Sequence, residues 1–367
     1  MHNWATALST WFGTHQRAMP WREILSPYRT WISEMMLQQT QVDTVIPYFG
    51  RFMARFPDVE TLASAPLDDV LKQWEGLGYY SRARNLHKAA QQIVAVHACT
   101  LPQTYKDLQT LPGIGPYAAA AIASIAYEVP VPVVDGNVLR VFTRFWGIAI
   151  DIRLPSVRQE IFDRLMPAIA TQTPSVFNQA MMELGALICT PTKPQCTRCP
   201  IQSDCVAYAT DQTDILPIKT KAKPVPHYVI GVGIIRYQGQ ILIAKRKESG
   251  MLGGLWELPG GKQNKNEHIE STVTREILEE TGLTVSIVQS LCIIKHAYTH
   301  FKITVHAYLC DAPHADAVAK SSSEVRWVTP EALTEYAFPT ATYKVFAAVG
   351  GMDFFSRHSF RCGGNAL

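Results

Sequence analysis

The sequence has no apolar run long enough to span a bilayer, and its first residues, MHNWATALSTWF, lack a cationic start followed by an apolar block. Those are the marks of a membrane helix and of a secretory signal peptide. We therefore expect a cytoplasmic protein without a membrane partner. Strong charge is missing too. The formal net charge is only +3, so any nucleic-acid binding must depend on where individual basic residues lie.

Strand-like alternation is absent before residue 225, and helical periodicity predicts an all-α domain over residues 1–210. A chain of 367 residues is too long for one ordinary domain. Residues 211–226 (DQTDILPIKTKAKPVP) are rich in Pro and Lys without apolar periodicity, which predicts a linker. Alternating apolar residues then predict an α+β domain over residues 227–350, followed by a C-terminal tail over 351–367.

Within the first domain, helices are expected over residues 3–17, 30–56 (interrupted near Pro47), 65–73, 81–97, 105–110, 118–127, 138–146, 156–169 and 174–187. In the second domain, we expect strands over residues 228–237, 240–246, 284–289, 303–309 and 325–328. A helix over residues 269–281 ends at Gly282, and residues 253–261 are expected to form a loop.

Four of the eight cysteines cluster with the spacing Cys-x6-Cys-x2-Cys-x5-Cys, at Cys189, Cys196, Cys199 and Cys205. Disulfides are not expected in the cytoplasm, so a metal site is the natural interpretation. Four thiolates suit either a [4Fe–4S] cluster or zinc. The compact spacing favours iron–sulfur, because zinc sites usually pair two short Cys-x-x-Cys halves across a longer gap.

The segment LPGIGPY, containing Gly113 and Gly115, predicts a tight turn before an Ala-rich helix. Free N–H groups at such a helix start can bind phosphate. The alternative is a plain turn between two helices. Downstream, Asp135 is placed to cap the next helix, and a carboxylate there is expected to stay ionised.

Glu34 lies in WISEMMLQQTQ, surrounded by apolar residues that could hold a proton on it. Glu34, Gln38 and Gln41 share one helix face. That polar stripe is either a solvent face or the lining of a cleft, and the apolar context favours the cleft.

The segments MPWRE, WISEMMLQQTQV, WEGLGYYSRARNL, LPGIGPYAAAAIASIAY, VVDGNVLRV and FNQAMMELGALICTP, together with the cysteine spacing, resemble the helix-hairpin-helix DNA glycosylases related to endonuclease III. The resemblance to the MutY family of adenine DNA glycosylases covers residues 4–210 nearly without gaps. It implies an all-α glycosylase domain with a [4Fe–4S] cluster in the loop 189–205. The implied partner is double-stranded DNA, bound by a monomer that joins the nucleoid when on DNA.

The resemblance also implies roles for individual residues. Cleaving the bond between adenine and its sugar needs a proton for the base and a negative charge near the sugar cation. Glu34 would donate the proton and Asp135 would supply the charge. The supporting residues fall into three sets: Tyr117 and Asn137 beside Asp135 and the sugar; Trp21, Arg22 and Gln179 around the flipped adenine; Gln39 and Tyr79 in the base stack near the lesion.

Lyase-competent relatives carry a lysine where this chain has Tyr117. A lysine amine attacks the sugar and forms a Schiff base, which a tyrosine cannot do. We therefore predict a monofunctional enzyme that removes adenine opposite 8-oxoguanine or guanine. The alternatives are a bifunctional glycosylase/lyase and a non-catalytic damage sensor.

The second domain contains a complete Nudix box, running from Gly261 through Glu267 and Arg275 to Leu283. Glu276, Glu279 and Glu280 share one helix face, as carboxylates around a Mg²⁺ ion would. By resemblance, this domain recognises 8-oxoguanine through Tyr298, Thr299 and His300 in the segment HAYTHF. That segment could also be an ordinary hairpin turn, and the intact box leaves hydrolysis of oxidised nucleoside triphosphates as an additional or alternative activity.

Overall fold

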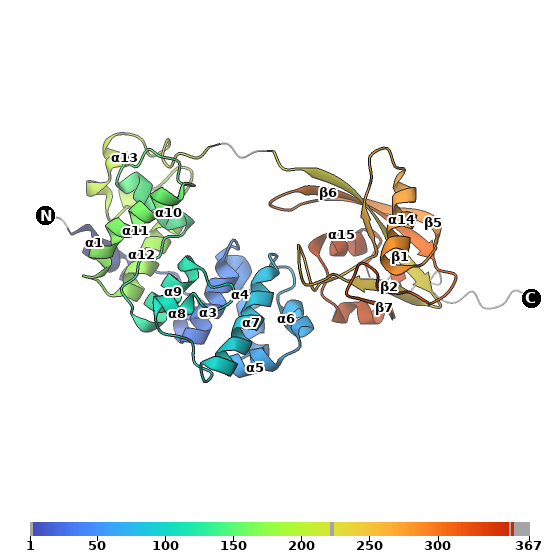
Figure 1. The fold of residues 1–367 in the computed structure, drawn as a ribbon. Coiled ribbons are helices and arrows are strands. Elements are labelled where there is room, and N and C mark those ends of the chain that lie inside the picture. Colours follow the sequence, from blue (N-terminus) through green and yellow to red (C-terminus); the bar gives the residue numbers. More distant parts are fainter. Residues whose placement is uncertain (1–2, 221–223, 352–353, 356–367) are drawn as a thin grey trace, which may run out of the picture. The chain divides into compact units, whose positions relative to one another are not determined.

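The computed structural model describes residues 3–220, 224–351 and 354–355. The chain forms two compact units (Figure 1). The first comprises Met1–Ser64 and Asn85–Ala222, and the second comprises Ala65–Arg84 and Lys223–Leu367. In the described ranges, no helix combines the length and the apolarity that crossing a membrane requires.

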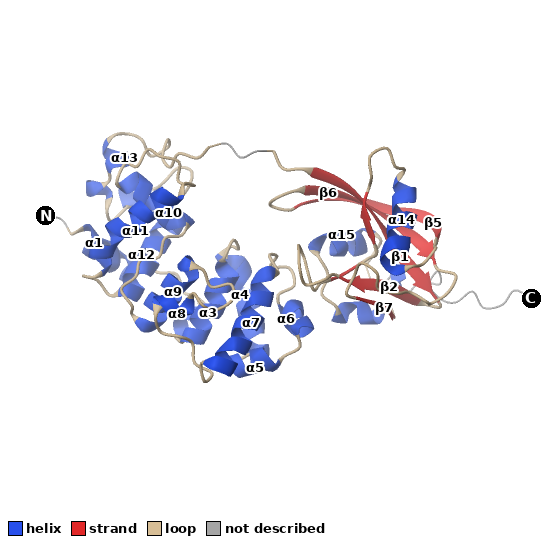
Figure 2. Cartoon of the chain, in the orientation of Figure 1, coloured by secondary structure: helices blue, strands red, loops and turns tan. Residues whose placement is uncertain are grey.

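The first unit is helical, as predicted (Figure 2). Its helices are α1 (Trp4–His15), α2 (Pro20–Glu23), α3 (Pro27–Leu37), α4 (Val42–Arg55), α5 (Val59–Ser64), α8 (Tyr105–Leu108), α9 (Pro116–Tyr127), α10 (Gly136–Phe145), α11 (Pro155–Ile169), α12 (Pro174–Leu187) and α13 (Val206–Ala209). Short 3-10 turns cover Cys196–Arg198 and Gln202–Asp204. Helix α7 (Ser81–Val96) crosses the boundary between the two units.

The predicted interruption of the 30–56 helix was placed wrongly. Pro47 lies inside α4, and the chain breaks instead between α3 and α4, where Gln39 adopts a left-handed backbone with φ of 60°. A left-handed backbone is uncommon for a residue with a side chain, and it cannot continue an α-helix. The helix therefore ends before Gln39, whereas α4 continues through Pro47. Helix α5 was not predicted.

The core of the first unit is rich in aromatic side chains. Trp4 of α1 lies 5.5 Å from Phe142 and 5.8 Å from Phe177, measured between ring centroids. These ring contacts connect α1, α10 and α12, whose buried apolar side chains form one cluster. The N-terminus of α10 packs closely on α12 at Gly185, where an added Cβ would lie 2.6 Å from the Cβ of Asn137. A glycine is therefore needed to bring Asn137 this near α12.

The second unit is built on a mixed sheet with strand order β3-β2-β1-β6-β5, in which β1 and β6 run parallel. Its strands are β1 (His227–Tyr237), β2 (Gln240–Lys245), β3 (Trp256–Glu257), β4 (Gly260–Lys262), β5 (Ser286–Ala297), β6 (Lys302–Asp311) and β7 (Glu324–Val328). Its helices are α6 (Leu67–Gln73), α14 (Ile269–Thr281) and α15 (Thr340–Ala348), with a 3-10 turn over Glu331–Glu335.

Helix α14 packs on one face of this sheet and α15 contributes to the apolar cluster of the other. Gly231 and Gly233 on β1 make room for α14, because a Cβ there would lie 2.7 Å and 2.6 Å from side-chain atoms of Val273 and Ile277. The expected loop over 253–261 was partly wrong, since it contains the short strands β3 and β4. Strands of two or three residues carry too little alternation to be detected in a sequence.

Other differences in the second unit are at element ends. Strand β5 runs to Ala297, well beyond the expected 284–289, and α15 was not predicted. Phe355 lies in the segment expected to be a tail, yet it is buried, with its ring 5.5 Å from that of Phe346. The rest of that segment, from residue 356, lies outside the described residues.

Candidate active site

A cavity of about 620 Å³ in the first unit is lined by residues from α2, α3, α9, α10 and α12. It gathers side chains that are far apart in the sequence. The predicted site residues among them are Trp21, Arg22, Glu34, Tyr117, Asp135, Asn137 and Gln179. Gln41 of the predicted polar stripe also lines it, so the stripe faces a cavity at two of its three positions. Gln38 and Gln39 are not in the lining set.

Glu34 lies deep in this cavity with 5% of its surface exposed. Its neighbours on α3, Trp31 and Met35, are fully or almost fully buried. Burial raises the pKa of Glu34 to about 7, opposed by the hydrogen bond that the Tyr117 hydroxyl donates to Oε2 at 2.7 Å. Asp135 raises this pKa further and Arg22 lowers it. The carboxyl group can therefore hold a proton near neutral pH.

Asp135 is the N-cap of α10. Its Oδ1 accepts a hydrogen bond from the backbone N–H of Val138 at 2.7 Å, and its Oδ2 accepts one from Asn137 Nδ2 at 3.0 Å. Burial raises the pKa of Asp135 above its ordinary value, and these hydrogen bonds and the charge of Arg140 offset only part of that rise. Two N–H donors aimed at the carboxylate favour its charged form. Its ionisation stays a prediction.

Arg140 connects this N-cap to the cysteine loop. Its Nη2 donates to Asn137 Oδ1 at 2.8 Å and to the carbonyl of Gly185 at 2.7 Å, while its Nε donates to the carbonyl of Cys189 at 2.7 Å. Sequence analysis gave Arg140 no role in the site. The sequence did contain one indication of this contact, because Arg140 follows Asn137 by three positions and therefore lies on the same face of the helix.

Glu183 is a second buried carboxylate that sequence analysis missed. Its side chain is 2% exposed and it accepts three hydrogen bonds from Arg17, two from the guanidinium and one from the backbone. These bonds lower the pKa of Glu183. It lies one turn after Gln179 on α12 and lines the same cavity. An acidic residue in the apolar stretch FNQAMMELGALI was the signal.

The four clustered cysteines line one cavity together with Arg144, whose Nη1 donates to Cys189 Sγ at 3.3 Å. Among the described residues, no three His, Cys, Asp or Glu side chains converge as the ligands of one metal ion would. A zinc ion holds its sulfurs at about 2.3 Å from one centre. The four thiols nevertheless share one cavity with the buried guanidinium of Arg144, and four cysteine thiolates are a donor set that an iron–sulfur cluster accepts.

The turn before α9 is built on a left-handed glycine and leaves the start of that helix without a side-chain cap. Gly113 has φ of 77°, and a Cβ there would lie 2.6 Å from the Cβ of Asn85. Gly115 is the N-cap of α9, and no side chain caps this helix end. The N–H groups in the first turn of α9 therefore have no side-chain acceptor at this helix end, and such groups can donate to an anion.

Tyr79 and Thr299, two further predicted site residues, meet in the second unit. Their hydroxyl groups are hydrogen bonded. Tyr79, like Gln39, has a left-handed backbone, with φ of 46°. Such strained positions persist where surrounding structure holds them, often at binding sites. Thr299 and His300 are exposed in the loop between β5 and β6, and the centroid of the Tyr298 ring lies 4.8 Å from that of Phe301, with the rings tilted.

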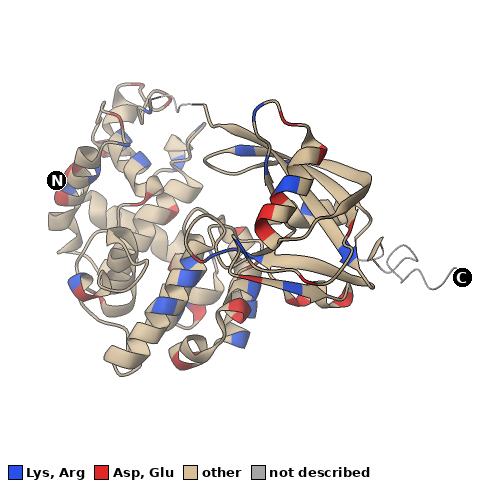
Figure 3. Ribbon diagram, turned by 45° about the vertical axis from the view of Figure 1, so that its right-hand side comes forward, with Lys and Arg blue, Asp and Glu red and all other residues tan. Residues whose placement is uncertain are grey.

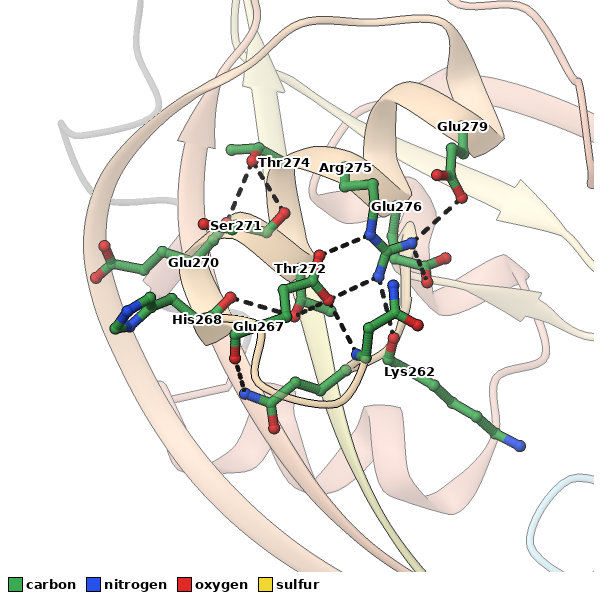
Figure 4. Close-up of polar contacts among 12 residues, drawn as sticks. Lys262, Glu267, His268, Glu270, Ser271, Thr272, Thr274, Arg275, Glu276 and Glu279 are labelled. Carbon is green, nitrogen blue, oxygen red and sulfur yellow. Dashed lines mark hydrogen bonds and ion pairs between the residues drawn. The ribbon is translucent and has the colours of Figure 1, made fainter.

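The Nudix box forms the loop before α14 and the helix itself, whose acidic positions are marked in Figure 3. Arg275 holds three carboxylates, with its nitrogens 2.7 Å from Glu267, 2.8 Å from Glu276 and 3.3 Å from Glu279 (Figure 4). Glu276 and Glu280 line a cavity of about 490 Å³, but Glu279 does not. In the described residues the three carboxylates predicted for Mg²⁺ do not converge on one point.

Both units of the chain are similar to known protein families. A model of the HhH-GPD superfamily of base excision DNA repair proteins matches residues 32–167, and a NUDIX-domain model matches residues 231–348. The first unit also resembles a thermostable thymine-DNA glycosylase of known structure, with 25% identity and a TM-score of 0.52. That match covers 56% of this chain and 95% of the other. The fold and site thus define a helix-hairpin-helix DNA glycosylase with a Nudix domain.

Several proteins are similar to this chain over most of its length, and their names identify the family. The adenine DNA glycosylase of Mus musculus is 34% identical over 92% of this chain and 76% of its own length. That of Homo sapiens is 33% identical over 95% and 74%, and that of Buchnera aphidicola from Acyrthosiphon pisum is 31% identical over 86% and 89%. The chain belongs to the adenine DNA glycosylase family. The predicted family and fold class are therefore confirmed.

Proposed function

We propose that this protein excises adenine opposite 8-oxoguanine or guanine in duplex DNA, as a monofunctional glycosylase. The observation that carries the proposal is the pairing of Glu34 and Asp135 in one cavity. Burial raises the pKa of Glu34 to about 7, and Asp135 is held by N–H donors. One carboxyl group is suited to give a proton and the other to carry charge.

In this reaction the adenine nucleotide is extruded from the duplex into the cavity. Glu34 protonates the adenine ring as the bond between the base and C1′ breaks, and the bonding electrons leave with the base. The Asp135 carboxylate stabilises the positive charge that develops on the sugar. Water then adds to C1′ and loses a proton, which leaves free adenine and an abasic site.

Tyr117 occupies the position from which a lysine would attack the sugar. Its hydroxyl donates to Glu34, and burial and the two nearby carboxylates raise its pKa well above the ordinary value. A phenol held neutral in this way is a poor nucleophile. The absence of an amine there supports excision without strand cleavage.

Cys189, Cys196, Cys199 and Cys205 would hold a [4Fe–4S] cluster in this proposal. When bound, the cluster would fold the loop between them. This chain's own residues then attach the loop to the catalytic helix, since Arg140 joins the Cys189 carbonyl to Asn137.

The test uses the purified chain and four assays. Excision is measured on duplexes with adenine opposite 8-oxoguanine, guanine or thymine, and covalent adducts are sought by borohydride trapping. Hydrolysis of 8-oxo-dGTP is measured with Mg²⁺. We expect rapid adenine release opposite 8-oxoguanine, slower release opposite guanine, and no trapped adduct. A high yield of adduct, or hydrolysis of the free nucleotide without excision, would overturn the proposal.

A further inference from the structure

The second unit carries a group of basic side chains beside the loop between β5 and β6. A cavity of about 380 Å³ lies there, and its polar lining residues are His227, Lys295, His296, Lys302 and Thr304. His227 and both lysines are exposed. Unlike the cavities around Glu34 and Glu280, this one has no carboxylate among the described residues that line it. Within the described part of the chain, neither lysine forms an ion pair.

Strand pairing places these side chains on one face of the sheet. Lys302 on β6 pairs with Ala297 on β5 and with His227 on β1, and Thr304 pairs with Lys295. Directly paired residues, and residues two apart on one strand, lie on the same face. The hydrogen bond between His227 Nε2 and Thr304 Oγ1, at 3.0 Å, agrees with this. His227, Lys295 and Lys302 therefore form one patch, which we call the hairpin basic patch.

The patch is exposed because the strands continue past the helix that covers the same face. Gly231, four residues after His227 on β1, already lies beside the first residue of α14, since a Cβ on Gly231 would be 3.3 Å from Ile269 Cδ1. His227 thus lies on the face that α14 covers but beyond the start of the helix. Figure 1 shows β1 and the β5–β6 hairpin extending past α14.

The chemistry of the hairpin basic patch fits the phosphates of a DNA backbone. Lysine ammonium groups bind phosphate as point charges. Lys295 and Lys302 are diagonal neighbours across β5 and β6, so their side chains begin about 7–8 Å apart and can reach two separate phosphates. Lys302 follows His300 by two residues, at most about 7 Å of chain, and His300 belongs to the loop predicted to contact 8-oxoguanine.

We propose that the hairpin basic patch binds neighbouring phosphates of the DNA strand that carries 8-oxoguanine. This inference rests on the proposed function, because the adjacent loop meets that strand only if the chain acts on such duplexes. Phosphate contacts hold a strand in position without reading its sequence. In this division, the loop distinguishes the base, whereas Lys295 and Lys302 strengthen binding to any duplex.

The salt dependence of duplex binding tests the proposal. Binding is measured with 8-oxoguanine opposite 2′-fluoro-adenosine, whose fluorine suppresses release of the base. Each phosphate contact contributes about 0.9 to the slope of log K against log salt concentration. K295M and K302M should therefore each lower the magnitude of this slope by about 1, and the double variant by about 2. The ratio of excision rates opposite 8-oxoguanine and guanine should stay as in the wild type, since phosphates carry no sequence information.

K320M is the matched control. Lys320 is exposed beside Gly282, at the other end of α14, so this variant loses the same charge from the same unit but outside the patch. Its salt slope should equal that of the wild type. An equal fall in K320M and K302M would contradict the proposal, because it would mark a general effect of net charge.

Methylphosphonates identify the strand, because each one removes the charge of a single phosphate. They are placed one at a time beside 8-oxoguanine and, in separate duplexes, beside adenine in the opposite strand. At a phosphate that Lys302 contacts, K302M should cost no further affinity, since the same interaction is already lost. We expect this loss of additivity in the 8-oxoguanine strand. Coupling confined to the adenine strand would contradict the proposal.

Two further outcomes would also contradict it. One is a wild-type salt slope in both K295M and K302M. The other is weaker binding of 8-oxo-dGTP in K302M with no change on duplex DNA, which would make the patch a site for the phosphates of a free nucleotide. Failure of the proposed function is distinguishable from these outcomes. A wild-type chain that releases no adenine would invalidate that function, whereas the salt slopes are measured on binding alone.

Discussion

Glu34 is a buried acid whose environment, more than its chemistry, sets its protonation. Burial raises its pKa to about 7, whereas the Tyr117 hydrogen bond opposes this rise. The apolar neighbours on α3 were visible in the sequence and sufficed to predict a protonated Glu34. The Tyr117 contact joins residues 83 positions apart, and nothing local in the sequence specifies which side chain meets Glu34.

The pH dependence of excision follows from this pKa. Glu34 must carry a proton to act as the acid, so the single-turnover rate should be flat below about pH 7 and fall as pH rises above it. In Y117F, the hydrogen bond that stabilises the carboxylate is gone, so the midpoint should move to higher pH. A wild-type rate that stays constant to pH 9, or an unchanged midpoint in Y117F, would contradict this assignment of the acid.

The same shift predicts a stability effect. The folded pKa of Glu34 lies near 7, above its ordinary value of 4.5, so between these values the folded state holds a proton that the unfolded state releases. Stability is therefore lost as pH rises through this window, by roughly 1.4 kcal/mol per pKa unit and about 3 kcal/mol in all. E34Q has no such loss.

We accordingly expect the Tm of E34Q to exceed that of the wild type by about 5 °C or more at pH 8 and to match it at pH 4.5. The variant should be inactive at both pH values. Differential scanning calorimetry measures the difference, and E23Q, at an exposed position on α2, is the control with a wild-type Tm throughout. A lower Tm for E34Q than for the wild type at pH 8 would show that ionisation of the buried Glu34 does not destabilise the folded state.

At the scale of elements, helix α10 has Asp135, the proposed catalytic carboxylate, at its start and Arg140, which bonds to the cysteine loop, one turn after Asn137. Asp135 was predictable as a cap, because Asp-Gly-Asn precedes an apolar periodic segment. The link was not, since Arg140 reaches carbonyl groups of α12 and of Cys189 that carry no sequence signature. Backbone acceptors are supplied by the fold and not by residue type.

Two substitutions on α10 should therefore have different consequences. R140M removes the bonds to Asn137 and to the Cys189 carbonyl, so we expect excision to fall by more than about tenfold while iron content and duplex binding persist. R144M removes the donor to Cys189 Sγ and should instead lower the iron bound per chain. Iron analysis and single-turnover kinetics separate the two. Loss of iron in R140M with normal kinetics would contradict this division.

At the scale of the whole molecule, the chain joins a helical unit that holds the Glu34 cavity to an α+β unit that holds the loop between β5 and β6. The sequence predicted both units, because the motifs are long and each periodic pattern is strong. Element ends and the short strands β3 and β4 were missed, since their residues pair with strands distant in sequence. The hydrogen bonds to Glu183 were missed for the same reason, because their donors, Arg17 and Arg22, lie far away in the sequence, between α1 and α3.

The loop between β5 and β6, which contains the residues predicted to recognise 8-oxoguanine, gives a prediction at this scale. Thr299 is exposed and its hydroxyl meets that of Tyr79, a strained residue predicted to enter the base stack. T299V keeps the shape and loses the hydroxyl, so the preference for 8-oxoguanine over guanine opposite adenine should fall several-fold. T304V is the control, because Thr304 lies on β6 of the same hairpin and its hydroxyl bonds to His227 on β1 instead of to Tyr79. An unchanged preference in T299V would remove Thr299 from lesion recognition.

The central claim is that Glu34 and Asp135 act on one extruded adenine nucleotide, and D135N tests it most directly. The amide keeps the size of the side chain and can still cap α10, but it carries no negative charge. Binding to a duplex with adenine opposite 8-oxoguanine and release of free adenine are measured on the same preparation. We expect wild-type binding with adenine release reduced by about a thousandfold or more. Adenine release near the wild-type rate would show that the charge of Asp135 does not stabilise the sugar cation, and the account would be wrong.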